Sequence, residues 1–306
     1  MQRLVSDGLV IVEGRGKMSR YVISPTSNIL NAIDIDKYFE QEIDERKIHA
    51  RFEFALFDQL KSIPSLFTQH ELNQLNRWHN EFTRNIQLLS PNQYKQELER
   101  LAIDLSWKSS QIEGNTYSLL ETERLLKEKV TANGKTKEEA IMLLNHKDAL
   151  DFIIAHPDYL NPLRVSVIED IHSLLVKDLA IDRNIRTTRV GISGSNYKPL
   201  DNSFEIKEAL ERTCELINNT PHAYTKALLC LVLLSYIQAF NDGNKRTARI
   251  IANALLMHQH YCPLSFRTVD SIAYKKAMLL FYEQHSIWAF KQLYMEQIDF
   301  AIHTYF

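Results

Sequence analysis

The feature that most restricts the fold is a run of residues, Ala227 to Tyr236, that is apolar on all sides of a helix. A helix without a polar face has to be buried on every side, so the sequence predicts a central helix within residues 223–240. The run stops at the polar turn Asn241-Asp-Gly-Asn-Lys-Arg246, and helical spacing resumes through Leu256. The predicted layout is a buried helix, a tight polar turn and an amphipathic helix.

The rest of the chain also predicts a mainly α fold. Only 8 glycines and 8 prolines occur in 306 residues, and apolar residues recur at helical spacing along most of the length. Examples are 52–60 and 71–88, with Pro64 and Pro91 as breaks. Two glycine-punctuated segments with β-branched residues, near 8–23 and 188–199, predict short hairpins.

Charge and cysteine content exclude some classes of protein. The net charge is -2 with acids and bases intermixed, so the chain lacks the basic block of a strong nucleic-acid binder. Cys214, Cys230 and Cys262 are widely spaced in apolar contexts, which indicates buried free thiols and a reducing compartment. No segment has the order of a signal peptide or the length of a membrane span. We expect a cytoplasmic protein without membrane contact.

Three regions are expected. Residues 1–24 form a winged-helix-like β-hairpin remnant, residues 25–93 an N-terminal helical region, and residues 94–306 the main domain. The segment Gly8 to Ile23 resembles the wing of a winged helix-turn-helix, but the helices that should precede it are missing. We therefore do not expect DNA binding, and the alternative is a hairpin packed on the following helices.

The turn at Asp242 has the properties of an anion site. A helix start presents unpaired N–H groups and the positive end of the helix dipole, and Gly243 and Asn244 let a ligand approach them. Arg246 and Arg249 would destabilise a helix N-terminus unless an anion compensated them, which indicates a polyphosphate or a carboxylate. Asp242 is a candidate Mg²⁺ ligand. The alternative is a helix N-cap with surface arginines.

The segment Gln238 to Arg249, QAFNDGNKRTAR, closely resembles the Fic family signature HxFx(D/E)GN(G/K)RxxR. The resemblance implies a helical core with a hairpin flap, and Mg²⁺-dependent transfer of AMP from ATP to a hydroxyl side chain of a target protein. The roles it implies are catalysis at Gln238 and Asn244, Mg²⁺ binding by Asp242, nucleotide phosphate binding by Gly243, Asn244, Lys245, Arg246 and Arg249, and anchoring of the loop by Phe240.

Position 238 departs from the family pattern, and Lys245 stands where many AMP-transferring relatives carry a second glycine. Gln238 stands where the family has the histidine that takes the proton from the attacking hydroxyl, and a neutral amide cannot do this. The roughly 10²- to 10⁴-fold contribution of a positioned base should be lost. Lys245 resembles the Doc-toxin branch, whose members phosphorylate their target; a solvent-facing lysine is the alternative. No other histidine is assigned to catalysis, because His172, His222, His258 and His260 lie in ordinary helical or helix-flanking contexts.

A second motif predicts a restraint on the site. Residues 97–111 have helical spacing, Gly114 is a good C-cap, and Glu113 then lies in the last helical turn. A carboxylate there is unfavourable by about 0.3 to 1 kcal/mol unless a cation pairs with it. Arg249 is a cation near a helix N-terminus, which is unfavourable unless an anion pairs with it. The segment Ser109 to Gly114, SSQIEG, also resembles the (S/T)xxxE(G/N) inhibitory motif of Fic proteins. The resemblance implies a class with an N-terminal inhibitory helix, here 97–115, whose residues Ser109, Glu113 and Gly114 restrain the site.

The segment 186–199 is expected to form an exposed edge hairpin. Alternation around Val190 and Ile192 with nearby glycines favours this reading. An exposed edge can take up an extended peptide as an added strand. The segment resembles the family flap that docks the target; a plain structural hairpin is the alternative. The docking residues would be Val190, Gly191, Ile192, Ser193 and Gly194.

The leading interpretation is an ATP- and Mg²⁺-using Fic protein with ancestral AMP transfer, autoinhibited by Glu113 and impaired by Gln238. Two alternatives stay open. One is a catalytically silent Fic-fold regulator that binds nucleotide or protein, and the other is a Doc-like phosphotransferase. The expected partner is a target protein on the flap, and a homo-oligomer is left open.

Overall fold

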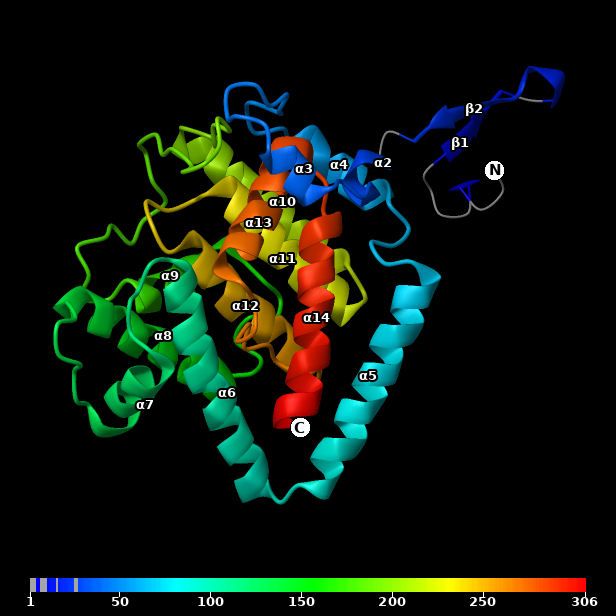
Figure 1. Ribbon diagram of the computed structural model, residues 1–306. Helices are drawn as coiled ribbons and strands as arrows, with labels where there is room; N and C mark the ends of the chain where they lie inside the picture. The colour runs from blue at the N-terminus through cyan, green and yellow to red at the C-terminus, as the bar shows by residue number, and fades with distance from the viewer. Residues whose placement is uncertain (1–3, 6–9, 15, 25–26) are drawn as a thin grey trace.

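The computed structural model describes residues 4–5, 10–14, 16–24 and 27–306. Helices dominate them, which confirms the mainly α fold (Figure 1). After the N-terminal hairpin the helices are α2 (Ser27–Leu30), α3 (Ile35–Phe39), α4 (Ala55–Ser62), α5 (Gln69–Leu88), α6 (Pro91–Ile112), α7 (Leu119–Glu128), α8 (Lys137–Ala155), α9 (Val165–Leu175), α10 (Ser203–Asn219), α11 (Ala223–Ile237), α12 (Asn244–His258), α13 (Ser271–Gln284) and α14 (Trp288–Tyr305).

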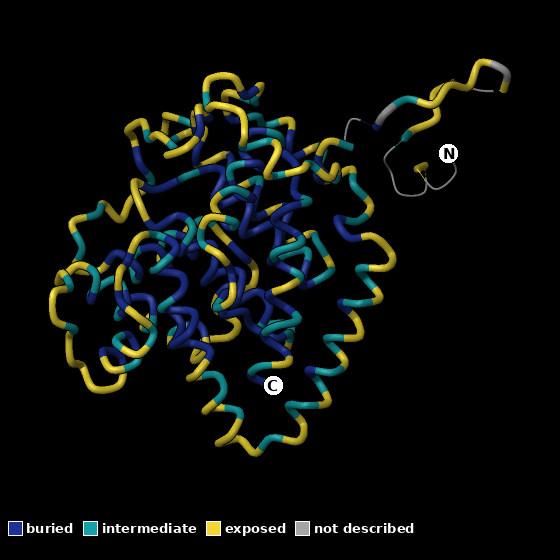
Figure 2. Tube along the Cα trace, viewed as in Figure 1, coloured by how far each residue is buried: buried dark blue, intermediate teal, exposed yellow. Residues whose placement is uncertain are grey.

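The N-terminal hairpin stands away from the helices. Strands β1 (Val10–Glu13) and β2 (Arg20–Ile23) pair antiparallel on either side of the 3-10 turn η1 (Gly16–Met18). Their side chains Ile11, Val12 and Tyr21 are exposed, and Figures 1 and 2 show the hairpin projecting from the body. The expectation that this hairpin packs on the following helices is therefore wrong for its described residues. Residues 8, 9 and 15 of the predicted segment lie outside the described part, and the winged-helix reading stays a prediction.

Local sequence sets the long helices α5 and α6. Each begins with a capping box, in which Thr68 pairs reciprocally with Glu71 and Ser90 with Gln93, and Pro91 occupies the first turn of α6. The predicted break at Pro91 is confirmed. The two helices diverge from this break, with α14 packed against both of them (Figure 1).

The core is built around α11, as the sequence predicts. Residues 227–237 of α11 are all buried, and α10, α12 and α13 pack around it (Figure 2). One continuous hydrophobic cluster runs from Ile29 to Tyr305, so segments on both sides of α5 and α6 contribute to it. The three cysteines are buried and free, as expected. None of the described helices has both the length and the apolar character that crossing a membrane requires.

The hairpin predicted in segment 186–199 is absent. The segment is an extended loop with a turn in which the Ser195 N–H donates to the Ile192 carbonyl at 3.2 Å. Backbone groups of this segment pair with other parts of the chain. Lys198 forms an isolated parallel bridge with Arg51, and the Arg186 N–H donates to the Ala239 carbonyl at 3.0 Å. Alternation and glycines predicted self-pairing, but these neighbours take the backbone groups that a hairpin would have used.

Candidate functional site

The turn between α11 and α12 depends on two residues with left-handed backbone conformation. Gln238 ends α11 at φ 52°, and Gly243 is the N-cap of α12 at φ 83°. A Cβ on Gly243 would lie 3.3 Å from Cδ2 of His172, closer than most side-chain contacts. Glycine is therefore required at position 243 both for its backbone angle and for space. The first N–H groups of α12 start directly behind it.

Asn244 closes the turn with its side chain. Its Oδ1 accepts from the Phe240 N–H at 2.9 Å, and its Nδ2 donates to the Phe240 carbonyl at 2.7 Å and to Gln238 Oε1 at 3.1 Å. The resemblance assigned phosphate binding and catalysis to Asn244. In this structure its side-chain amide is bonded within the turn and holds the turn in shape.

His172 packs against the turn and contacts its backbone. Its ring stacks on Phe240 at 3.7 Å between centroids with planes 5° apart, and it is fully buried. Nε2 lies 3.0 Å from the Asp242 carbonyl and Nδ1 lies 3.2 Å from the Arg183 carbonyl. Burial lowers the pKa of His172, so the neutral ring donates to one carbonyl at a time. His172 is the structural residue that its sequence context indicated, although nothing local marked it as the support of this site.

The Arg246 side chain is buried beside the turn, and part of its guanidinium makes no hydrogen bond within the described chain. It is 0% exposed, and its Nη2 donates to Asp242 Oδ2 at 2.8 Å. Among the described residues its Nε and Nη1 have no partner. Asp242 Oδ1 accepts from the Gly243 N–H at 2.6 Å, and the Asp242 side chain is 53% exposed. The alternative of surface arginines is wrong, because Arg246 and Arg249 are both fully buried.

Arg249 pairs with Glu113, the contact that the mismatched helix ends predicted. Its Nη2 lies 2.7 Å from Glu113 Oε1. Its Nη1 donates to the carbonyl and hydroxyl oxygens of Ser109 at 3.0 and 2.7 Å, and its guanidinium lies 4.8 Å from the ring centroid of Tyr274. Burial alone would raise the pKa of Glu113, but the charges of Arg249 and Lys245 outweigh it and hold the pKa below its usual value. The inhibitory role of this pair stays a prediction.

Glu113 lies just beyond the helix and not in its last turn. The last helical residue of α6 is Ile112, Glu113 is the C-cap, and Gly114 follows at φ 105° as the predicted helix terminator. Lys245 Nζ lies 3.4 Å from Glu113 Oε2, and its side chain is 25% exposed. The alternative of a solvent-facing lysine is therefore wrong, and Glu113 is held between two cations.

Gln238 is fixed at both ends of its amide. Its Nε2 donates to the Ser235 carbonyl at 2.6 Å, and its Oε1 accepts from Asn244. Neither end carries a proton that titrates near neutral pH. The side chain therefore occupies the position expected of the general base as a fixed hydrogen-bonding group.

The space left at the turn is small. The cavity there measures about 60 Å³ and is lined by Glu113, Gln238, Asn241, Asp242, Gly243, Asn244 and Lys245. Small-molecule sites usually enclose about 300 to 1,000 Å³. The cavity at this turn is therefore much smaller than a usual small-molecule site, and Glu113 and Lys245 form part of its wall.

Arg186 joins the segment 186–199 to the turn, and sequence reasoning missed it. It is 1% exposed, its Nε donates to the Gln238 carbonyl at 2.6 Å, and its Nη1 donates to the Thr188 carbonyl at 2.6 Å. Thr188 Oγ1 also donates to Asn241 Oδ1 at 3.2 Å. The partner of Arg186 in the turn is a backbone carbonyl 52 residues away, so this contact has no local sequence signal.

The predicted docking residues lie outside the small cavity. Gly191, Ser193 and Gly194 are exposed, whereas Val190 and Ile192 are partly buried. Arg46 Nη2 donates to the Gly194 carbonyl at 2.9 Å, which ties the loop tip to the segment before α4. The structure brings the catalytic, cofactor-binding, inhibitory and metal candidates together and leaves the docking candidates on an adjoining loop.

Comparison with known proteins agrees with this geometry. Residues 162–256, which contain α9, α10, α11 and most of α12, match the family model described as the Fic/DOC family. The chain is 27% identical over 178 residues to the protein adenylyltransferase Fic of Nematostella vectensis, a match that covers 54% of this chain and 39% of that protein. It is 28% identical over 159 residues to the protein of the same name from Drosophila grimshawi, covering 50% of this chain and 32% of that one. The chain thus spans well under half of these relatives' length.

Solved structures share the fold. Fic-1 from C. elegans superposes with a TM-score of 0.66 at 19% identity, over 78% of this chain and 70% of that one. A Fic-domain-containing signaling protein from Bacteroides thetaiotaomicron gives a TM-score of 0.63 at 19% identity, over 74% of this chain and 95% of that one. At this identity the likeness concerns the fold.

Proposed function

Because this chain carries a Fic domain, we propose that it transfers AMP from ATP to a hydroxyl side chain of a target protein, under restraint by Glu113. The observation that carries the proposal is the Glu113–Arg249 pair at 2.7 Å, which closes an anion-binding turn. In the resting chain the Glu113 carboxylate occupies Arg249. An anionic ligand such as a triphosphate would have to displace Glu113 before it could bind Arg249. The adenylyltransferase relatives support AMP as the transferred group.

The turn has the groups that a triphosphate requires. Gly243 would bring the N–H groups of the α12 start close to a ligand, and in the described part of the chain Nε and Nη1 of the buried Arg246 have no partner. Unpaired buried cationic donors are costly unless an anion or water meets them, so they fit a phosphate oxygen. The half-exposed Asp242 carboxylate would hold Mg²⁺, which would neutralise phosphate charge.

The proposed reaction explains why position 238 limits the rate. The target's hydroxyl oxygen forms a bond to the α-phosphorus of ATP, the bond between the α-phosphorus and the bridging oxygen breaks, and pyrophosphate leaves. The hydroxyl proton has to go to a base. Gln238 can accept a hydrogen bond from the hydroxyl but cannot take its proton, so we expect a rate roughly 10²- to 10⁴-fold below that of a histidine.

Glu113 restrains the site in two ways. Its carboxylate takes the guanidinium that the outer phosphates would otherwise meet, and it lines the cavity of about 60 Å³ in which they would lie. A negative charge beside a triphosphate also repels it. Removing this carboxylate should open the site and strengthen ATP binding.

The target would dock on the loop 190–194. The loop residues Gly191, Ser193 and Gly194 are exposed, and Arg186 links the loop to the turn that ends α11. An extended peptide could pair with this exposed backbone even though the loop is not a strand in the free chain.

The experiment compares label transfer from α-³²P-ATP and γ-³²P-ATP into lysate proteins. The variants are Glu113→Ala, Gln238→His and the double variant, with Glu138→Ala as the matched control because Glu138 is exposed on the first turn of α8. We expect α-label, strongest in the double variant and at the wild-type level in Glu138→Ala. Label from γ-³²P-ATP alone would show phosphorylation and refute AMP transfer. Lys245, which lies beside Glu113, would favour that reaction.

A second candidate is a catalytically silent module that binds nucleotide. It is favoured by the Gln238 amide, whose two ends are both bonded within the turn so that it serves as part of the scaffold. Under this alternative the Glu113→Ala variant binds Mg²⁺-ATP in calorimetry, but no label is transferred even after Gln238→His. That result would refute the proposed transferase.

A further inference from the structure

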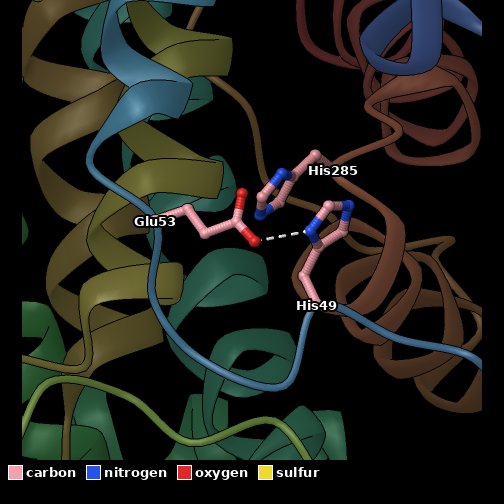
Figure 3. A group of neighbouring side chains, drawn as sticks. All are labelled: His49, Glu53 and His285. Atoms are coloured by element: carbon pink, nitrogen blue, oxygen red, sulfur yellow. Dashed lines mark hydrogen bonds and ion pairs between the residues drawn. The ribbon is translucent and has the colours of Figure 1, made fainter.

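A group of metal-ligating side chains lies away from the turn. His49 and Glu53 come from the segment that precedes α4, and His285 ends α13 (Figure 3). Each side chain offers one donor atom, and the three atoms lie within 4.8 Å of one another. His49 Nδ1 is already 2.7 Å from Glu53 Oε1. The stick view shows the three side chains pointing toward one another.

The backbone around this group is held in place. The His49 N–H donates to the Glu283 carbonyl at 2.9 Å, which fixes the segment against α13. The Tyr236 hydroxyl lies 2.9 Å from His285 Nε2 and accepts from the Glu53 N–H at 3.1 Å. Such bonds set the position of two of the three residues before any ligand arrives.

The exposure of the three side chains suits an ion that enters from solvent. The His285 side chain is buried, whereas the side chains of His49 and Glu53 are 36% and 43% exposed. The rings of His49 and His285 stack at 4.1 Å with planes 13° apart. The inner donor is therefore fixed, and the two outer donors can rotate toward an ion.

We propose that His49, Glu53 and His285 bind a divalent transition-metal ion of the zinc class. Two imidazoles and one carboxylate are a donor set that zinc takes at about 2.0 to 2.2 Å, with a fourth position left for water. Tetrahedral bonds of that length put the donors roughly 3.3 Å apart. To close from at most 4.8 Å, the partly exposed His49 and Glu53 side chains would rotate, and the His49 ring would leave its stack on His285.

The charges around the group agree with a cation. Within the described part of the chain, the recorded ion-pair partner of Glu53 is His49, and neither lysine nor arginine pairs with that carboxylate. The lone carboxylate supplies the negative charge that a divalent ion requires.

A bound ion would join distant parts of the chain. His49 and Glu53 precede α4, whereas His285 lies beyond residue 280, and the Ala50 carbonyl also accepts from the Lys198 N–H at 3.0 Å. The site would therefore cross-link the N-terminal segment to α13 beside the loop that follows Arg186. It uses neither Asp242 nor Glu113, so it stands independently of the proposed transferase.

Zinc titration of the full chain tests the site. Chelator-stripped protein is titrated with Zn²⁺ against a chromophoric competing chelator, using wild type, His49→Gln, Glu53→Gln and the control His70→Gln, which alters an exposed histidine of α5. We expect one equivalent of tight binding in wild type and the control. Each site variant should bind at least about tenfold more weakly. Zn²⁺ should also raise the melting temperature of wild type and the control, but not of the site variants.

Two outcomes would overturn the proposal. One is wild-type protein that fails to compete with the chelator for Zn²⁺. The other is zinc binding by both site variants with the wild-type affinity, which would place the ion elsewhere. The partly exposed residues are varied because a change at the buried His285 could unfold the chain; circular dichroism of each variant establishes that its fold is retained.

Discussion

Replacing Glu113 by glutamine should destabilise the chain at neutral pH by an amount that the contacts of Arg249 determine. Breaking a buried ion pair by removing one partner usually costs about 3 to 5 kcal/mol. Arg249 is fully buried but keeps the Ser109 carbonyl and hydroxyl and the Tyr274 ring, so we expect the lower end, about 3 kcal/mol. At roughly 2 °C per kcal/mol for a domain of this size, the melting temperature should fall by about 6 °C.

The pH dependence of this loss has a definite sign. The folded-state pKa of Glu113 is lowered from the ordinary value of 4.5, so the carboxylate stabilises the fold above that pH. Its contribution is lost as the pH falls through the folded-state value. The difference between wild type and Glu113→Gln should therefore be full at about pH 7 and shrink below pH 4.5.

Urea unfolding at several pH values measures both effects, with Glu138→Gln as the control for loss of an exposed carboxylate. Addition of Mg²⁺-ATP should restore more stability to Glu113→Gln than to wild type, because phosphate can then meet Arg249. A variant as stable as wild type at neutral pH would refute the reasoning. A loss that stays constant down to acidic pH would show that the carboxylate charge is not its cause.

Two further exchanges test the turn, each by urea unfolding. Gly243→Ala combines a left-handed φ of 83° with a Cβ 3.3 Å from His172, so it should cost more than the roughly 1 to 2 kcal/mol of the backbone angle alone. Gly134→Ala, at φ 75° with open space around its Cβ, is the control, and an equal loss would contradict the steric argument. Asn244→Ala leaves the buried Phe240 N–H without its partner and should cost about 2 kcal/mol and weaken nucleotide binding. The exposed Asn80→Ala should do neither, and an unchanged Asn244→Ala would show that its amide does not hold the turn.

The central helix and the turn could be predicted because their signals are local. A run without a polar face predicts burial wherever it lies, and Gly243 behind it marks a left-handed position at the helix start. The Glu113–Arg249 contact could also be predicted, because each residue is electrostatically misplaced at its own helix end and the two mismatches are complementary.

Other parts of the site depend on partners far along the chain. His172 reaches the Asp242 carbonyl across 70 residues, and Lys245 reaches Glu113 across 132. Neither residue differs in local context from a helical histidine or a surface lysine. The hairpin predicted near Val190 fails for the same reason, because alternation records which residues favour a strand and not which backbone groups remain free to pair.

The position of Glu113 at the end of α6 decides how the site can open. From Leu101 to Ile112 this helix is mostly buried, so moving it as a unit would expose core, whereas turning one side chain past Gly114 would not. Breaking the pair at about 3 kcal/mol corresponds to an equilibrium ratio of about 150 to 1, so fewer than one molecule in about a hundred would be open at any instant. Under the proposed transfer, the basal rate of the resting chain would be the product of this open fraction and the rate that Gln238 permits.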